Sequence, residues 1–172
     1  AYLSEEKRLR QLGIKLHPID IARSPFMLQA NQKALQQIMG IIRKYSIQAI
    51  HCHTPVGGLL GRLAGKLTQG KPPIVIYTAH GFHFYKGAPL FNWLTYFEVE
   101  KALARYTDIM IVINEEDYRR AHLFRLKKNG ALYKIPGIGL DTDRFHPLSK
   151  AERQAGRMRL GIGEKDFFLV SV

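Results

Sequence analysis

The sequence has one cysteine, Cys52, and only 14 acidic residues against 26 lysines and arginines. A single cysteine excludes an internal disulfide, and its apolar, strand-like neighbours predict a buried, unreactive thiol. No apolar run approaches the roughly 20 residues that span a bilayer. Residues 1–12 are amphipathic and charged, without the apolar core of a signal peptide.

The shortage of acidic residues leaves a formal net charge of +12 in 172 residues. Such a charge favours an anionic partner: nucleic acid, a phosphorylated ligand or an acidic membrane surface. A basic, solvated surface without a partner is the alternative. Because no recognition helix, aromatic RNA-binding pattern or zinc finger accompanies the charge, we expect no nucleic-acid partner.

Apolar runs and amphipathic stretches alternate along the chain in units near 30 residues. This order predicts βαβ crossovers and an α/β fold, a parallel sheet with helices on both faces. The expected helices are 2–12, 26–45, 59–67, 90–106, 115–126 and 150–160. The expected strands are an edge strand over 14–19, then 47–52, a central strand from 74, 109–113, 132–135 and 167–172.

The segment 136–149 contains two prolines and two glycines and is typical of a linker. We therefore predict a first domain over 1–135, this linker, and the start of a second domain over 150–172. The final apolar run opens a strand with nothing after it, so we expect the natural protein to continue beyond both ends of this chain.

The segment Ile74–Gly87 organises the chain. Its apolar run is typical of a strand buried on both faces, and His80, Gly81 and His83 follow where the strand ends. Open α/β folds bind ligands at this edge of the sheet. His80 could hydrogen-bond a sugar hydroxyl or accept its proton, whereas a histidine bonded into its own loop is the alternative.

Two further histidines, His51 and His53, alternate with Cys52 at the end of the preceding strand. Alternation places both imidazoles on one face of the strand and Cys52 on the other. A catalytic zinc needs a third ligand, and no acidic residue is near in sequence, so we predict no metal site and expect hydrogen bonds to a loop or ligand.

Gly57 and Gly58 lie in the strand-to-helix turn after His53. This turn could offer backbone amides to a phosphate or a sugar hydroxyl, although close packing of helix on sheet explains the glycines equally well. The turn lacks the GxGxxG order, so a dinucleotide site is poorly supported.

The helix expected over 90–106 has more large apolar side chains than one core-facing stripe needs. Some should face outward as an interface, for a membrane surface, a protein partner or a second copy of the chain. A basic run follows it, and a few such charges can dock a domain on an anionic leaflet. We predict a membrane or acceptor surface made of Phe91, Trp93, Tyr96, Phe97, Arg119, Arg120, Arg125, Lys127 and Lys128.

Four blocks of sequence resemble retaining glycosyltransferases of the GT-B, family-four type that act in capsule and exopolysaccharide synthesis. The blocks are IHCHTPVGGLLGRLAG (50–65), YTAHGFHFYKGAP (77–89), EVEKALARYTDIMIVINEED (98–117) and IPGIGLDTDRFHP (135–147). Ile138 stands where relatives often have asparagine. The family's first strand with its glycine loop and its Glu-x7-Glu signature are not found here.

The resemblance implies a Rossmann-like acceptor domain, followed by a linker into a donor domain. It implies that His80 reaches the transferred sugar, and we predict that His51, His53, Gly57, Gly58, Gly81 and His83 line the cleft. It also implies no metal or cofactor, a nucleotide-sugar as donor substrate, and a lipid-linked glycan acceptor at the cytoplasmic face of the membrane. We expect this chain alone to be inactive. The alternative function is a non-catalytic Rossmann-like module that binds a phosphorylated ligand or a protein partner.

Overall fold

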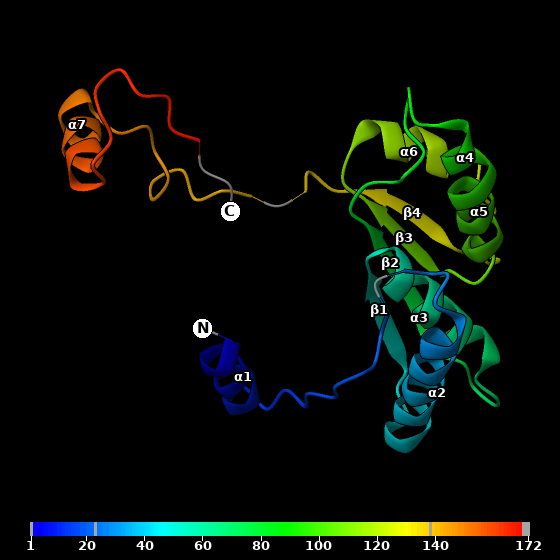
Figure 1. Ribbon diagram of the computed structural model, residues 1–172. Coiled ribbons are helices and arrows are strands. Elements are labelled where there is room, and N and C mark those ends of the chain that lie inside the picture. The colour runs from blue at the N-terminus through cyan, green and yellow to red at the C-terminus, as the bar shows by residue number, and fades with distance from the viewer. Residues whose placement is uncertain (1, 23, 138, 170–172) are drawn as a thin grey trace. The chain divides into compact units, whose positions relative to one another are not determined.

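Four parallel strands form the sheet in the computed structural model, which describes residues 2–22, 24–137 and 139–169 (Figure 1). They are hydrogen-bonded in the order β1-β2-β3-β4. The predicted α/β class with a parallel sheet and flanking helices is confirmed, but the helices that connect the strands lie on one face of the sheet and not on both. The bounds of the strands are β1 Ala49–His53, β2 Ile74–Ala79, β3 Ile109–Val112 and β4 Ala131–Lys134.

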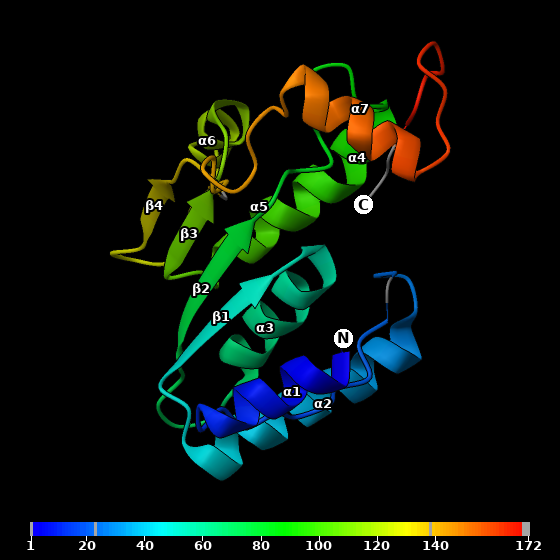
Figure 2. The ribbon, with the colours of Figure 1, turned by 90° about the vertical axis from the view of Figure 1, so that its left-hand side faces the viewer.

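The helices that connect the strands gather on one side of the sheet (Figures 1 and 2). Each strand is added beside the previous one, and right-handed crossovers then place every connection on the same face. The bounds of the described helices, including α1, α2 and α7, which do not connect strands of this sheet, are α1 Tyr2–Gln11, α2 Leu28–Tyr45, α3 Pro55–Leu67, α4 Leu90–Asn92, η1 Trp93–Phe97, α5 Glu98–Ala104, α6 Glu115–Ala121 and α7 Lys150–Arg159.

The core of the first unit lies between the sheet and the connecting helices α3, η1, α5 and α6. Val75 and Tyr77 of β2 and Met110 and Val112 of β3 alternate along their strands and are buried toward the helices. Phe84, from the loop after β2, is fully buried among them. The sheet edge that carries the histidines is therefore held by a packed interior on one side.

A buried ion pair ties α3 to α5 beneath β2. Arg62 is fully buried, donates to Glu100 at 2.7 Å, and stacks on the Tyr77 ring at 4.1 Å. Tyr77 donates its hydroxyl proton to the other oxygen of Glu100 at 3.2 Å. Burial, followed by the neighbouring Glu100 charge, raises the pKa of Tyr77 far above its usual range. Removing one partner of this ion pair would leave an uncompensated buried charge.

The predicted edge strand over 14–19 is wrong. The described residues from Gly13 to Ala22 contain no strand, and they lie along α2 instead. Asp20 pairs with Lys33 at 2.7 Å, and His17 packs its ring 5.1 Å from that of Tyr45. An edge strand needs a neighbouring strand to bond, and none among the described residues pairs with this segment.

Three expected helices differ from their predicted extent, the first being α3, which begins at Pro55 and not at residue 59. The helix over 90–106 is divided into α4, η1 and α5, in which η1 is a π-helical turn. The helix over 115–126 ends as α6 at Ala121. Residues 167–169 form no strand, and 170–172 lie outside the described residues.

The described chain divides into two compact units, one up to Gly137 and one after it. In the second unit, α7 begins with a capping box in which Ser149 and Glu152 satisfy each other's backbone amides. The predicted domain and linker boundaries remain predictions.

Candidate functional site

Three histidines and a threonine meet where β1 and β2 end. His51 Nε2 lies 2.8 Å from Thr78 Oγ1, and His53 Nδ1 lies 2.9 Å from His80 Nε2. The ring centroids of His51 and His53 are 4.3 Å apart, and those of His53 and His80 are 5.2 Å apart. The parallel register places His53 opposite Thr78, two residues before His80. We call His51, His53, Thr78 and His80 the histidine cluster.

The environment of His53 favours its neutral form. Loss of water around the ring, followed by the charges that His51 and His80 would carry, lowers the pKa of His53 below its ordinary value of 6.5. One ring of the His53–His80 pair must donate a proton and the other must accept it. Protonating both rings would set two N–H groups against each other and break the bond.

Thr54, the residue after the cluster, has a strained backbone. Its φ is +63°, a value that β-branched residues rarely adopt. Strain of this kind persists where the surrounding structure enforces it, and it gathers at functional sites. Thr54 caps α3, and its Oγ1 accepts a hydrogen bond from the Gly57 amide at 3.3 Å.

The amides of the two predicted ligand-binding glycines are used within the helix. Gly58 N donates to Thr54 O at 2.8 Å, and Gly57 N donates to the Thr54 hydroxyl. A Cβ on Gly58 would lie 2.4 Å from the ring of Tyr77. Gly58 thus has the packing role that the sequence left open as the alternative.

The loop that carries His80, Gly81 and His83 is anchored from the beginning of α6. Asp117 accepts a hydrogen bond from Phe82 N at 3.2 Å, and Glu116 accepts one from Lys86 N at 2.6 Å. Gly81 has φ +135°, a backbone conformation that residues with a side chain rarely adopt. An added Cβ would meet nothing within 4 Å, so glycine is needed here for its backbone conformation and not for lack of space.

Sequence reasoning missed these anchors. Asp117 is buried and its burial raises its pKa, which the hydrogen bonds from Asn114 and Phe82 oppose. The signal available in the sequence was Asn114 three residues before Asp117, which is an N-cap pattern. It indicated the helix start but not the loop that the carboxylate holds.

His83 does not join the histidine cluster. Its ring stacks on Tyr96 of η1, with centroids 4.8 Å apart and planes inclined by 27°. Asn92 donates to the His83 carbonyl at 2.7 Å and fixes the loop against α4.

The predicted aromatic surface is only partly outward. Trp93 and Phe97 pack on the buried Phe84, at ring-centroid distances of 5.7 and 5.3 Å. Phe91 is 58% exposed, and Leu90 and Leu94, which belong to the same helix but not to the predicted surface set, are 72% and 67% exposed. The outward face of this region is therefore more aliphatic than expected.

The predicted basic run is largely neutralised by ion pairs. Arg119 pairs with Glu115 and Arg120 with Glu116, one helical turn earlier in α6. Lys127 pairs with Asp108 at 2.7 Å. Arg125 and Lys128 have no ion pair with any residue that the structure describes. The charges available to an anionic surface are thus fewer than the sequence suggested.

Cys52 is buried, as predicted, and burial raises the pKa of its thiol to about 11. Within residues 2–22, 24–137 and 139–169, no group of three histidine, cysteine, aspartate or glutamate side chains is placed to hold a metal ion. None of the described helices is long and apolar enough to cross a membrane.

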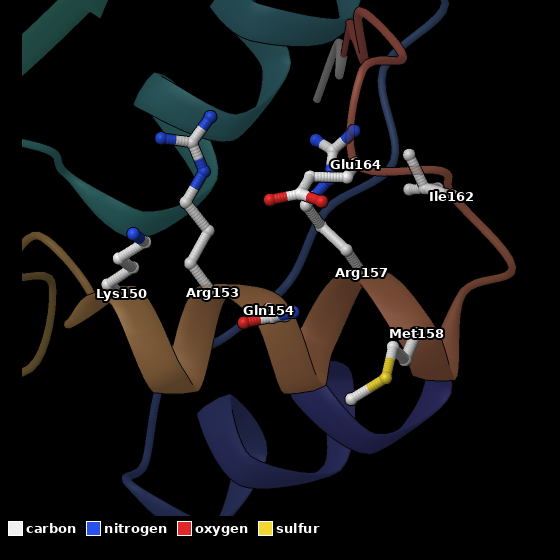
Figure 3. A pocket seen from close by; sticks show the side chains of 7 residues that line it. All are labelled: Lys150, Arg153, Gln154, Arg157, Met158, Ile162 and Glu164. Atoms are coloured by element: carbon white, nitrogen blue, oxygen red, sulfur yellow. The ribbon is translucent and has the colours of Figure 1, made fainter.

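The second unit has a small basic hollow of about 220 Å³ beside α7 (Figure 3). Lys150, Arg153 and Arg157 project from one side of α7, as Figure 3 shows. Arg157 donates to the backbone carbonyls of Gly163 and Asp166, so it holds the turn after α7.

Comparison with known proteins gave a family and two relatives. Residues 2–114 match the family described as "Glycosyl transferase 4-like". A Bacillus subtilis (strain 168) protein named "Putative glycosyltransferase EpsD" is 50% identical over 152 residues, which are 88% of this chain and 39% of that protein. An Escherichia coli "UDP-Gal:alpha-D-GlcNAc-diphosphoundecaprenol alpha-1,3-galactosyltransferase" is 26% identical over 117 residues, 68% of this chain and 30% of that protein. The chain therefore spans less than half the length of either relative.

Proposed function

We propose that this chain, which belongs to the glycosyl transferase 4-like family, is the acceptor-binding part of an enzyme that transfers a sugar from a nucleotide-sugar to a lipid-linked glycan. We further propose that the transfer retains the anomeric configuration and serves surface polysaccharide synthesis. The name of the Escherichia coli relative, which includes a lipid diphosphate acceptor, supports the acceptor class.

The observation that carries the proposal is the hydrogen bond of 2.9 Å between His53 and His80 at the carboxyl edge of the sheet. It fixes the orientation of the His80 ring and engages its Nε2. The other ring nitrogen, Nδ1, is then the one that can meet a substrate. A ring held by a second residue is pre-organised for a ligand.

In our proposal His80 Nδ1 bonds a hydroxyl of the transferred sugar. If His80 Nε2 donates to His53, then Nδ1 is unprotonated and accepts the hydroxyl proton. In the opposite tautomer, Nδ1 donates to the hydroxyl oxygen. Both arrangements require neutral imidazoles, which the lowered pKa of His53 favours.

Departure of the nucleoside diphosphate is an electrostatic task, served by donors aimed at the developing charge. We assign that task to parts of the protein other than this chain, and we expect the chain alone not to turn over substrate. The proposal gives no metal ion a role. The exposed Leu90, Phe91 and Leu94 support peripheral contact with the inner face of the cell membrane.

The test is a donor screen on the full-length protein with a lipid-diphosphate-linked acceptor, followed by NMR of the anomeric centre of the product. We expect one nucleotide-sugar to be consumed with retention. His80→Ala should lower kcat by about 100-fold, within the range for a positioned histidine. His146→Ala, in the second unit, is the matched control and should keep wild-type turnover. Normal turnover in His80→Ala would refute the role given to His80.

A further inference from the structure

A pocket of about 420 Å³ lies beside the histidine cluster, and the assignments above give it no role. Three separate segments line it: Ile21, Ala22 and Pro25 before α2, residues 54–56 at the beginning of α3, and the pair His83 and Tyr96. Thr54 directly follows His53, and His83 is three residues after His80. The pocket therefore adjoins the cluster on both of its chain segments.

One wall of this pocket is a fixed aromatic stack. His83 and Tyr96 lie nearly parallel, 4.8 Å apart. The π-helical turn η1 turns Trp93 and Phe97 to the core, where both contact Phe84, while Tyr96 contacts His83. Single π-helical turns are frequent at functional sites. Since Asn92 also holds the His83 carbonyl, the stack is pre-organised.

The remaining walls are apolar, with polar groups only at a few points. Ile21, Pro25, Pro55 and Val56 supply the apolar surface, and Ile21 is 44% exposed. The described side chains that line the pocket include no lysine, arginine, aspartate or glutamate. The available polar groups are the hydroxyls of Thr54 and Tyr96 and the His83 ring nitrogens. A diphosphate would find no cation among these side chains.

This combination matches the chemistry of a sugar ring. A pyranose has an apolar C–H face that packs on an aromatic ring and hydroxyls around its edge that need a few donors and acceptors. The volume is within the range of small-ligand pockets, which are mainly apolar with few placed polar groups. A sugar bound here would lie next to the cluster that contains His80.

We propose that this pocket binds the sugar ring of the glycan acceptor, with His83 and Tyr96 as the residues that determine acceptor specificity. The inference rests on the proposed transferase function, which it deepens by separating the acceptor subsite from the histidine cluster.

The first experiment measures steady-state kinetics of the full-length protein with GlcNAc-diphospho-undecyl as acceptor. Tyr96→Ala should raise the KM for acceptor at least 10-fold and leave the donor KM and acceptor-independent donor hydrolysis unchanged. Tyr96→Phe keeps the stack and should stay within about threefold of wild type. The matched control is Tyr85→Ala, a half-exposed tyrosine that is outside the pocket, on the loop that carries His83.

The proposal is overturned if Tyr96→Ala leaves the acceptor KM within twofold, if donor KM rises in parallel, or if Tyr85→Ala has the same effect. A raised acceptor KM in Tyr96→Ala together with an unchanged melting temperature of that same variant separates a loss of binding from a loss of folding.

A second experiment distinguishes this inference from the proposed function. Saturation-transfer NMR with methyl glycosides of glucose, galactose, mannose, GlcNAc and GalNAc detects sugar binding without turnover. We expect at least one glycoside to bind wild type and Tyr85→Ala but not Tyr96→Ala. That result without transfer from any donor supports the pocket and counts against the proposed function. No binding by wild type, or equal binding by Tyr96→Ala, overturns the pocket.

Discussion

His53 links the two histidines that the parallel strands bring together. Its Nδ1 bonds His80, and its ring lies between those of His51 and His80. Loss of water around the ring, followed by the charges of its neighbours His51 and His80, disfavours the charged form, so the pKa of His53 is lowered in the folded protein. His53 is a positioning residue for His80, and its protonation state should affect both stability and activity.

The first prediction concerns this pH dependence. The unfolded chain, with His53 at its ordinary pKa of 6.5, binds a proton more readily than the folded chain does. The stability that neutral His53 contributes to the fold is therefore fully present above pH 6.5. It is lost as the pH falls toward the lowered pKa of His53 in the folded protein. We expect the urea midpoint to fall over this range in wild type and to fall less in His53→Gln.

His146→Gln, outside the cluster, is the control and should keep the wild-type slope. A His53→Gln protein whose urea midpoint declines as steeply as that of wild type between pH about 7 and about 5.5 would contradict this assignment.

The helix α3 packs on β1 and β2 through glycines. Added Cβ atoms would lie 2.4 Å from Tyr77 at Gly58, 2.0 Å from Cys52 Sγ at Gly61, and 2.5 Å from Val75 at Gly65. These separations are too short for any Cβ contact, so α3 lies on the strands at a distance that only glycine permits. This close approach holds the beginning of α3, and with it Thr54, at the ends of the strands.

The second prediction is that Gly61→Ala destabilises the protein. Alanine gains about 1 kcal/mol of helix propensity over glycine, but overpacking a core costs about 1–3 kcal/mol and sometimes more. We expect a net loss of about 1–2 kcal/mol in the free energy of unfolding, measured by urea denaturation.

Two variants check the cause of this loss. Adding Cys52→Ala to the Gly61→Ala variant removes the sulfur atom that the new Cβ would meet. This double variant should recover part of the stability that Gly61→Ala loses. Gly40→Ala in α2, where an added Cβ meets nothing within 4 Å, should raise stability by up to about 1 kcal/mol. A double variant whose loss equals the sum of the two single losses would argue against the contact.

The predicted membrane surface combines an apolar patch with a basic run that is largely ion-paired. Leu90, Phe91 and Leu94 are the strongly exposed members, whereas Trp93 and Phe97 support the core. Arg125 and Lys128 follow α6 without an ion pair among the described residues. The membrane contact that we propose would therefore depend more on apolar side chains than on the basic run.

The third prediction follows from this balance. Replacing Leu90, Phe91 and Leu94 together by serine should lower the affinity of the full-length protein for vesicles at least 10-fold, since each apolar side chain buried in lipid contributes about 1.5–3 kcal/mol at most. The double variant Arg125→Ser with Lys128→Ser should reduce only the part of the vesicle affinity that depends on anionic lipid, by about 1 kcal/mol per charge. Co-sedimentation with neutral and anionic vesicles measures both effects.

Leu67→Ser, on an exposed leucine at the end of α3, is the matched control and should bind as wild type does. Co-sedimentation that neither the apolar triple variant nor the lipid charge alters would remove the membrane contact from the proposal.

The amino-acid sequence determined the order and type of most elements and the general place of the site. Apolar runs marked β1 to β4, helical periodicity marked α2 and α3, and parallel pairing required His53 and His80 to approach each other at one edge. These signals are local, or follow from strand direction alone.

Only the tertiary structure decided which side chains meet across the chain. The hydrogen bonds from the His80 loop to Asp117 and Glu116, the Arg62–Glu100 pair and the inward turn of Trp93 and Phe97 join residues far apart in sequence. Dependence on distant contacts also explains why no strand forms over 14–19. A strand needs a neighbouring strand to bond, and the apolar pattern of one segment does not show whether such a neighbour exists. Periodicity describes one element at a time, whereas a site and its anchors depend on how several elements pack together.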